Sequence, residues 1–193
     1  MSQALADQQS QRTGHVELLD IGLVIGTSLL MAACAHVSIP LWFTPVPITL
    51  QTFGVTLLAL TLGGLRASAA LVLYLLEGLS GLPVFSPHGL GGMAQLLGPT
   101  GGYLMAYPLA ALAGGLLVEK LLRRSRLIAF SLAAVTCDAI ILAAGALWIF
   151  AVSHRTFTGV IAISVLPFLP GEILKASAAV AAALGKEKLR ARI

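Results

Sequence analysis

Two residues of opposite charge lie three positions apart inside an otherwise apolar segment of this chain. They are Glu172 and Lys175, in the run PFLPGEILK at residues 167–175. On a helix this spacing puts both side chains on one face. A bilayer-crossing helix needs about 20 residues, and counting back from the basic stretch at Lys186 places Lys175 near mid-membrane depth. A charge there costs about 2.5–3.5 kcal/mol or more, so it normally faces a protein cavity and marks a ligand site or a pathway.

Two interpretations of this pair are open. The two side chains could neutralise each other as a structural ion pair. Alternatively, Lys175 meets an anionic group of a ligand while Glu172 accepts hydrogen bonds from ligand N–H donors. Pro167, Pro170 and Gly171 favour the second interpretation, because they interrupt the helix, and interrupted backbone at membrane depth is tolerated where it lines a cavity.

The composition is that of an integral membrane protein. Of 193 residues, 58% are hydrophobic and 10% are charged, whereas a soluble domain carries about 25% charged residues. The net charge of +4 does not indicate a nucleic-acid partner, because the basic residues cluster at the ends of apolar segments. We therefore expect an all-α membrane protein.

Six apolar segments predict six transmembrane helices. Ten of the twelve Lys and Arg residues fall on one side of them, in the N-terminal segment, two connections and the C-terminal tail, so both termini are predicted to be cytoplasmic. The expected organisation is a cytoplasmic segment at 1–17, a membrane domain at 18–185 and a basic cytoplasmic tail at 186–193. The segments lie at 18–37, 48–65, 67–82, 101–118, 127–152 and 160–184.

Two outward connections have unusual compositions. Residues 38–47 contain three prolines beside Trp42 and Phe43, which indicates a stiff, extended segment at the membrane interface. It could also be only an aromatic anchor. Residues 83–100 are rich in glycine, which permits close approach of backbone to a ligand. A loop this long is expected to fold back over the bundle.

Few other polar residues could serve a site. Asp138 lies in the fifth segment and could face the same cavity or be a hydrogen-bonded structural acid. The chain has no Asn, so Gln51 and Gln95 are the amides near the outward face. His88 and His154 are isolated and lack metal-ligand spacing, so no metal and no cofactor is expected.

Helix packing and catalytic motifs bear on partners and activity. Gly22 and Gly26 are four residues apart, which allows another helix to approach closely, although such spacing arises often by chance in a chain rich in small residues. A homo-oligomer is left open. No G-x-x-x-x-G-K-[ST], G-x-S-x-G or H-E-x-x-H run is present, so neither ATP binding by a P-loop nor an enzyme is expected.

Three motifs together resemble those of the BioY family, the biotin-specific substrate-binding (S) components of energy-coupling factor (ECF) transporters. They are FTPVPITLQT at 43–52, GLPVF at 81–85 leading into GPTGGY at 98–103, and PGEILK at 170–175. The resemblance implies a six-helix S component in the cell membrane. Such a component captures biotin from outside and docks on a transmembrane coupling subunit driven by two ATPases.

The resemblance also maps the family's acidic–x–x–Lys pair onto Glu172 and Lys175, with Glu in place of the common Asp. The expected ligand-binding residues are Glu172, Lys175, Gln51, Thr44, Phe43, Phe85, Gln95, Tyr103 and Asp138, and the expected docking residues are Gly22 and Gly26. Three alternatives remain: an S component for another vitamin, a stand-alone transporter using Glu172 or Asp138 as a proton carrier, and an intramembrane enzyme.

Overall fold

The structure is a computed structural model that describes residues 22–122 and 125–190. The predicted N-terminal segment with Arg12, and also Arg123 and Arg124 of the basic connection, lie outside these residues. Ten elements follow in chain order: a first helix Gly22–His36, β1 Ser38–Ile39, β2 Ile48–Thr49, α2 Gln51–Leu62, α3 Gly64–Leu79, α4 Gly92–Leu97, α5 Gly101–Leu121, α6 Arg126–Val152, α7 Phe157–Ser164 and α8 Leu169–Arg190.

The fold is a bundle of helices, because an apolar chain in lipid must satisfy its backbone hydrogen bonds within the same segment. By length and composition, two described helices, α5 and α6, could cross a membrane alone. The pair α7 and α8 counts as a third span broken by a bend of 48°. The break spans residues 165–168 and contains Pro167, as predicted, whereas Pro170 and Gly171 lie in the first turn of α8 and do not interrupt it. The first helix and α2 are apolar but shorter, so the count of six spans stays a prediction.

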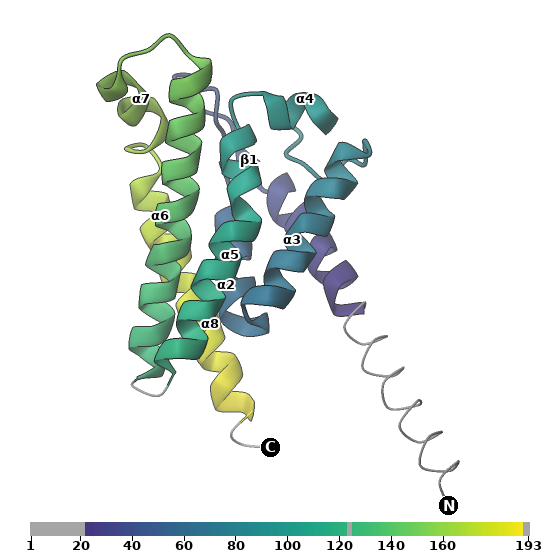
Figure 1. Ribbon diagram of the computed structural model, residues 1–193, viewed down its shortest axis with the longest axis vertical. Helices are drawn as coiled ribbons and strands as arrows, with labels where there is room; N and C mark the ends of the chain where they lie inside the picture. Colours follow the sequence, from purple (N-terminus) through teal and green to yellow (C-terminus); the bar gives the residue numbers. More distant parts are fainter. Residues whose placement is uncertain (1–21, 123–124, 191–193) are drawn as a thin grey trace, which may run out of the picture.

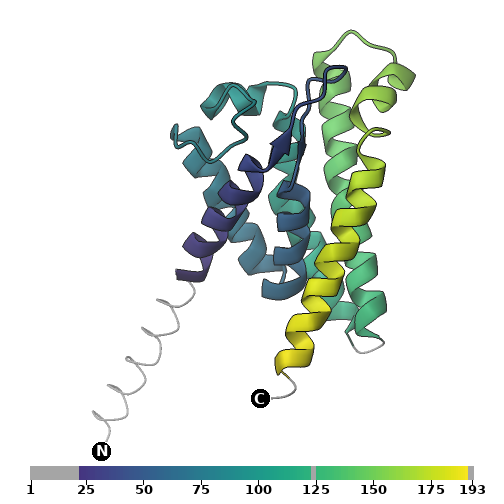
Figure 2. The ribbon, with the colours of Figure 1, turned by 180° about the vertical axis from the view of Figure 1, so that it is seen from behind.

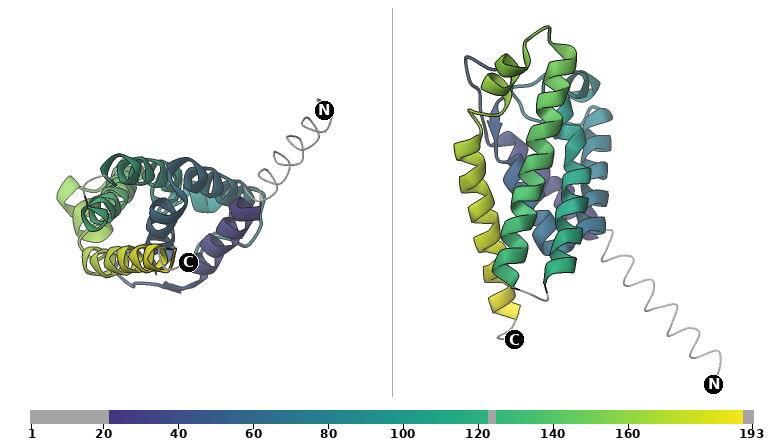
Figure 3. Two further views of the ribbon diagram at one scale, coloured as in Figure 1. Left: turned by 90° about the horizontal axis from the view of Figure 1, so that it is seen from below. Right: turned by 60° about the vertical axis from the view of Figure 1, so that its left-hand side comes forward.

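The irregular parts of the chain gather at one end of the bundle. The β1–β2 hairpin, α4 and α7 lie at the top in Figure 1, opposite the end of α5 and the start of α6. Seen from behind, α8 runs beside α2, and the first helix lies at the far edge (Figure 2). The views in Figure 3 show α5 and α6 as an adjacent antiparallel pair. Helices thus form a scaffold whose upper end carries the loops.

The hairpin and the turn after α2 show how local sequence sets this arrangement. Ser38 pairs with Thr49, and Ile39 pairs with Ile48, in antiparallel register. This short pairing returns the proline-rich segment to the top of α2. At the opposite end, Gly63 has φ +84°, a left-handed conformation that favours glycine, so α3 begins directly after α2.

Close contacts between helices depend on glycine. A Cβ at Gly115 of α5 would lie 2.2 Å from the backbone nitrogen of Gly64 in α3, and one at Gly114 would lie 2.4 Å from Cys137 Sγ in α6. Small residues at such crossings let helices approach closely in a membrane, where van der Waals packing drives association. These two neighbouring glycines therefore bring α3, α5 and α6 together.

Gly115→Ala should lower the thermal stability of the detergent-solubilised protein. The added methyl group would clash with the backbone of Gly64, which cannot rotate away as a side chain can. Overpacking of this kind costs about 1–3 kcal/mol. The matched control is Gly185→Ala in α8, where no atom of the described residues outside the helix's own backbone lies within 4 Å of the added Cβ. That control should melt at or above the wild-type temperature. Equal melting temperatures for Gly115→Ala and the wild type would contradict this packing.

Candidate ligand-binding site

Lys175 forms the centre of a polar cluster at the junction of α8 with the start of α2. Its Nζ donates to Glu172 Oε1 at 2.6 Å, to Thr52 Oγ1 at 2.6 Å and to the Thr49 carbonyl oxygen at 3.0 Å. An ammonium has three N–H donors, so each has an acceptor. The Lys175 and Glu172 side chains are 12% and 6% exposed. The pair is therefore buried and internally neutralised.

Glu172 owes its position to the break between α7 and α8. It lies in the first turn of α8, where the backbone N–H groups stabilise a negative charge. Only one of its carboxylate oxygens is used: within the described residues, Oε2 is buried and has no hydrogen-bond partner. The hydroxyl of Ser86 is buried and unpartnered in the same sense. Because buried polar atoms are nearly always hydrogen-bonded, two such atoms together indicate a place for a ligand.

Both residues line one cavity at the loop-bearing end of the bundle. Its empty space is about 540 Å³, a figure that includes open solvent at its mouth. Half of its lining residues are aromatic or aliphatic, and half carry polar or charged side chains. The lining residues are Val46, Pro47, Thr49, Gln51, Thr52, Ser86, Gln95, Thr100, Tyr103, Leu104, Tyr107, Ile141, Leu142, Phe168, Glu172 and Lys175.

Five residues expected from the sequence line this cavity: Glu172, Lys175, Gln51, Gln95 and Tyr103. The two amides are already engaged. Gln51 donates to Tyr74, and Gln95 donates to Thr100 Oγ1 at 2.7 Å while accepting from the backbone of Gly91. The tyrosine hydroxyl of Tyr103 donates to the Ser164 carbonyl oxygen at 2.7 Å. These three side chains shape the walls.

The structure does not bring four other expected residues onto this cavity. Phe43 is 43% exposed and packs edge-on against Trp42, which is 95% exposed. Thr44 is buried, and its hydroxyl accepts from the backbone nitrogen of Val46. Phe85 is buried against Tyr74, with ring centroids 5.4 Å apart. Their assignment to ligand binding stays a prediction without geometric support.

Asp138, the fourth, lies in a neighbouring groove between α6 and α8. This groove contains about 1230 Å³ of empty space, is mostly apolar, and shares Leu142 and Glu172 with the cavity. Asp138 therefore approaches the Glu172 side chain from outside the cavity. The two expected docking glycines, Gly22 and Gly26, lie exposed on the first helix, and a Cβ added at either would meet no described atom within 4 Å.

Several lining residues were not expected. Thr49 and Thr52 lie in the FTPVPITLQT motif, at the end of β2 and the start of α2. Tyr107 follows Tyr103 by four residues in α5, so both face one side. The motif and the tyrosine spacing were signals in the sequence. Ser86 and Phe168 carried no such signal, because each sits in an irregular connection.

Fold and site together define a helical membrane protein with a partly polar cavity among its helices. A similar fold occurs in the crystal structure of the S-component for biotin from an ECF-type ABC transporter. The TM-score is 0.82 at 25% identity, covering 90% of this chain and 93% of that chain.

Sequence comparisons identify the family. A profile of the BioY family matches residues 7–192, and the chain belongs to this family, as its motifs predicted. It is 33% identical over 161 residues to the probable biotin transporter BioY of Pyrococcus horikoshii, covering 83% of this chain and 91% of the relative. It is 36% identical over 154 residues to the biotin transporter BioY of Rhizobium etli, covering 77% of this chain and 80% of the relative. These relatives are named transporters, not enzymes.

Glu172→Ala should destabilise the folded protein strongly, because it leaves the Lys175 ammonium buried without its counter-charge. Removing one partner of a buried ion pair costs about 3–5 kcal/mol. The control is Glu187→Ala, which breaks the more exposed Arg126–Glu187 pair and should cost at most about 1 kcal/mol. Thermal unfolding in detergent measures both. Equal losses of stability in the two variants would show that burial of the Glu172–Lys175 pair does not contribute to its effect on stability.

Proposed function

We propose that this protein captures biotin and takes part in its transport across the cell membrane as the S component of an ECF-type transporter. The observation that carries the proposal is the neutralised Glu172–Lys175 pair, which leaves one carboxylate oxygen without a partner among the described residues, inside a cavity with both apolar and polar walls. Family membership and the named relatives support biotin as the ligand.

The chemistry of biotin fits this cavity. Its ureido group has two N–H donors and one carbonyl acceptor, and it is fused to a sulfur-containing ring that bears an apolar chain ending in a carboxylate. Glu172 Oε2 is a free acceptor for a ureido N–H, and the Ser86 hydroxyl is a free donor for the carbonyl. Tyr103, Tyr107 and Phe168 offer apolar surface to the rings.

This orientation differs from the hypothesis that Lys175 binds the ligand's carboxylate. The Lys175 nitrogen already has three acceptors around it, and Glu172 is one of them. A second carboxylate at this point would be repelled by Glu172. We therefore propose that the ureido end lies at the ion pair and the carboxylate lies toward the cavity mouth.

The distribution of basic residues supports a membrane topology. We propose six spans with both termini in the cytoplasm. Arg66, Lys120, Arg126, Lys186 and Lys188 belong to the end of the bundle opposite the cavity, which supports a cytoplasmic location for that end. The cavity then opens outward, and α8 continues past residue 185 into the proposed cytoplasmic tail. Homo-oligomerisation remains part of the proposal to be measured.

Isothermal titration of the purified protein tests biotin capture, with Lys175→Ala beside the wild type. The variant should bind at least about 30-fold more weakly, since truncating a buried charged partner costs about 2–5 kcal/mol. Lys186→Ala is the matched control, because Lys186 also donates from α8 to a carbonyl of α2, that of Thr61, but away from the cavity. The control should bind normally. Near-native affinity in Lys175→Ala would reject its role.

The outcome for the wild type separates the alternatives. If the folded protein does not bind biotin but binds another vitamin from a panel, that vitamin is the ligand, and the proposed S-component architecture still holds. Biotin uptake by proteoliposomes that contain this protein without ATPases, abolished by a protonophore, would favour the proton-coupled transporter. Neither result is expected.

Docking on a coupling subunit driven by two ATPases is the remaining part of the proposal, with Gly22 and Gly26 at the contact. Replacing both by leucine should leave biotin affinity intact and reduce co-purification with the coupling subunit, because the added side chains would hold a partner helix away. A double substitution at Leu23 and Ile25 to alanine controls for general changes to this exposed helix face. Unchanged co-purification of the leucine variant would remove the docking role.

A further inference from the structure

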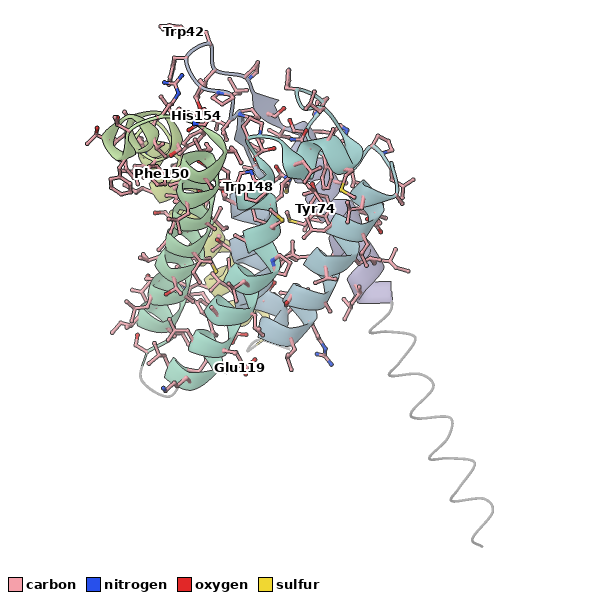
Figure 4. The ribbon with its side chains drawn as sticks, turned by 45° about the horizontal axis from the view of Figure 1, so that its top comes forward. Trp42, Tyr74, Glu119, Trp148, Phe150 and His154 are labelled. Atoms are coloured by element: carbon pink, nitrogen blue, oxygen red, sulfur yellow. The ribbon has the colours of Figure 1, made fainter. Side chains whose placement is uncertain are left out.

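A relay of buried hydrogen bonds runs from the Lys175 cluster to the turn that carries Ser86. Its middle is Tyr74 of α3, which is fully buried inside the bundle (Figure 4). The Tyr74 hydroxyl accepts from Gln51 Nε2 at 2.8 Å and donates to the Val84 carbonyl oxygen at 3.0 Å. Tyr74 does not itself line the cavity.

The first half of the relay joins Tyr74 to the ion pair. Gln51 Oε1 accepts from Thr49 Oγ1 at 3.1 Å, and the Thr49 carbonyl oxygen accepts from Lys175 Nζ at 3.0 Å. The oxygen and the nitrogen of the Gln51 amide therefore each have one hydrogen-bond partner in this relay. The relay ties the position of the ammonium to that of the tyrosine hydroxyl.

The second half fixes the turn. The Phe85 ring packs on the Tyr74 ring, and it also lies so close to Gly78 that an added Cβ there would be 2.0 Å from the ring. Polar and apolar contacts from α3 thus hold two consecutive residues, Val84 and Phe85. The next residue is Ser86, whose buried, unpartnered hydroxyl belongs to the cavity wall.

We infer that Tyr74 is a positioning residue: its hydroxyl fixes Ser86 relative to the Glu172–Lys175 pair, so that both can contact one ligand. The inference rests on the proposed function. It differs from a structural role alone, because it predicts that the contribution of Ser86 to binding depends on the Tyr74 hydroxyl.

A double-mutant cycle tests this dependence by calorimetry with biotin. In the wild-type background, Ser86→Ala should weaken binding about fivefold, as expected for one neutral hydrogen bond. Tyr74→Phe keeps the ring contact with Phe85 and removes both hydrogen bonds, and it should weaken binding at least as much. In the Tyr74→Phe background, Ser86→Ala should change the affinity less than about twofold, because coupled residues are not additive.

Tyr103→Phe is the matched control. Tyr103 is also a buried tyrosine that donates to a backbone carbonyl oxygen, that of Ser164, but it anchors α7 rather than the Ser86 turn. In that background Ser86→Ala should keep its fivefold effect. Equal effects of Ser86→Ala in the wild-type and Tyr74→Phe backgrounds, or unchanged affinity of Tyr74→Phe, would overturn the inference. Failure of the wild type to bind biotin would instead overturn the proposed function.

A measurement without ligand tests the geometric part in membrane vesicles, without purification. Ser86→Cys, with Cys34 and Cys137 replaced by alanine, should react slowly with a thiol reagent because position 86 is buried. Adding Tyr74→Phe should raise the rate several-fold, whereas adding Tyr103→Phe should not. Equal rates with and without the Tyr74 hydroxyl would contradict its positioning role.

Discussion

A buried ammonium in a membrane must have an acceptor for each of its N–H donors, and this requirement at Lys175 organises the upper half of the molecule. The three acceptors come from the end of β2, the start of α2 and the first turn of α8, and the contacts to Thr49 and Thr52 join residues more than 120 positions apart in the chain. The Glu172 carboxylate balances the positive charge of Lys175. Its own negative charge is stabilised by the backbone N–H groups of the first turn of α8. The ion pair therefore requires that α8 begin where it does, after the break at Pro167.

Most of the irregular backbone that the structure describes lies at the same end, around the cavity. The β1–β2 hairpin, the turn at Val84–Ser86, α4 and the α7–α8 break all lie there. Elsewhere, glycine crossings such as that of Gly115 on Gly64 hold the helices close together. The molecule thus consists of a helical scaffold, which is held together by close packing, and a set of loops, which form the mouth of the cavity.

Much of this could be predicted from the sequence, because the signals were local. Helix spacing placed Glu172 and Lys175 on one face, prolines predicted the break beside them, and the motifs identified the family. Local signals did not predict the positions of Phe43, Phe85 and Asp138. A span that is apolar on every side does not indicate which face turns inward, so Asp138 of α6 could not be assigned to the cavity or to the groove beside it. The direction of loop aromatics depends on contacts such as that of Phe85 with Gly78, which no local pattern encodes.

We propose that Glu172 Oε2, which belongs to a neutralised ion pair, accepts a hydrogen bond from a ureido N–H of biotin. An experimental structure of the protein with biotin bound tests it most directly. The account predicts the ureido group within hydrogen-bond distance of Glu172 Oε2, near the Ser86 hydroxyl, with the carboxylate toward the mouth. A structure with the carboxylate at Lys175, or with biotin in the groove between α6 and α8, would contradict it.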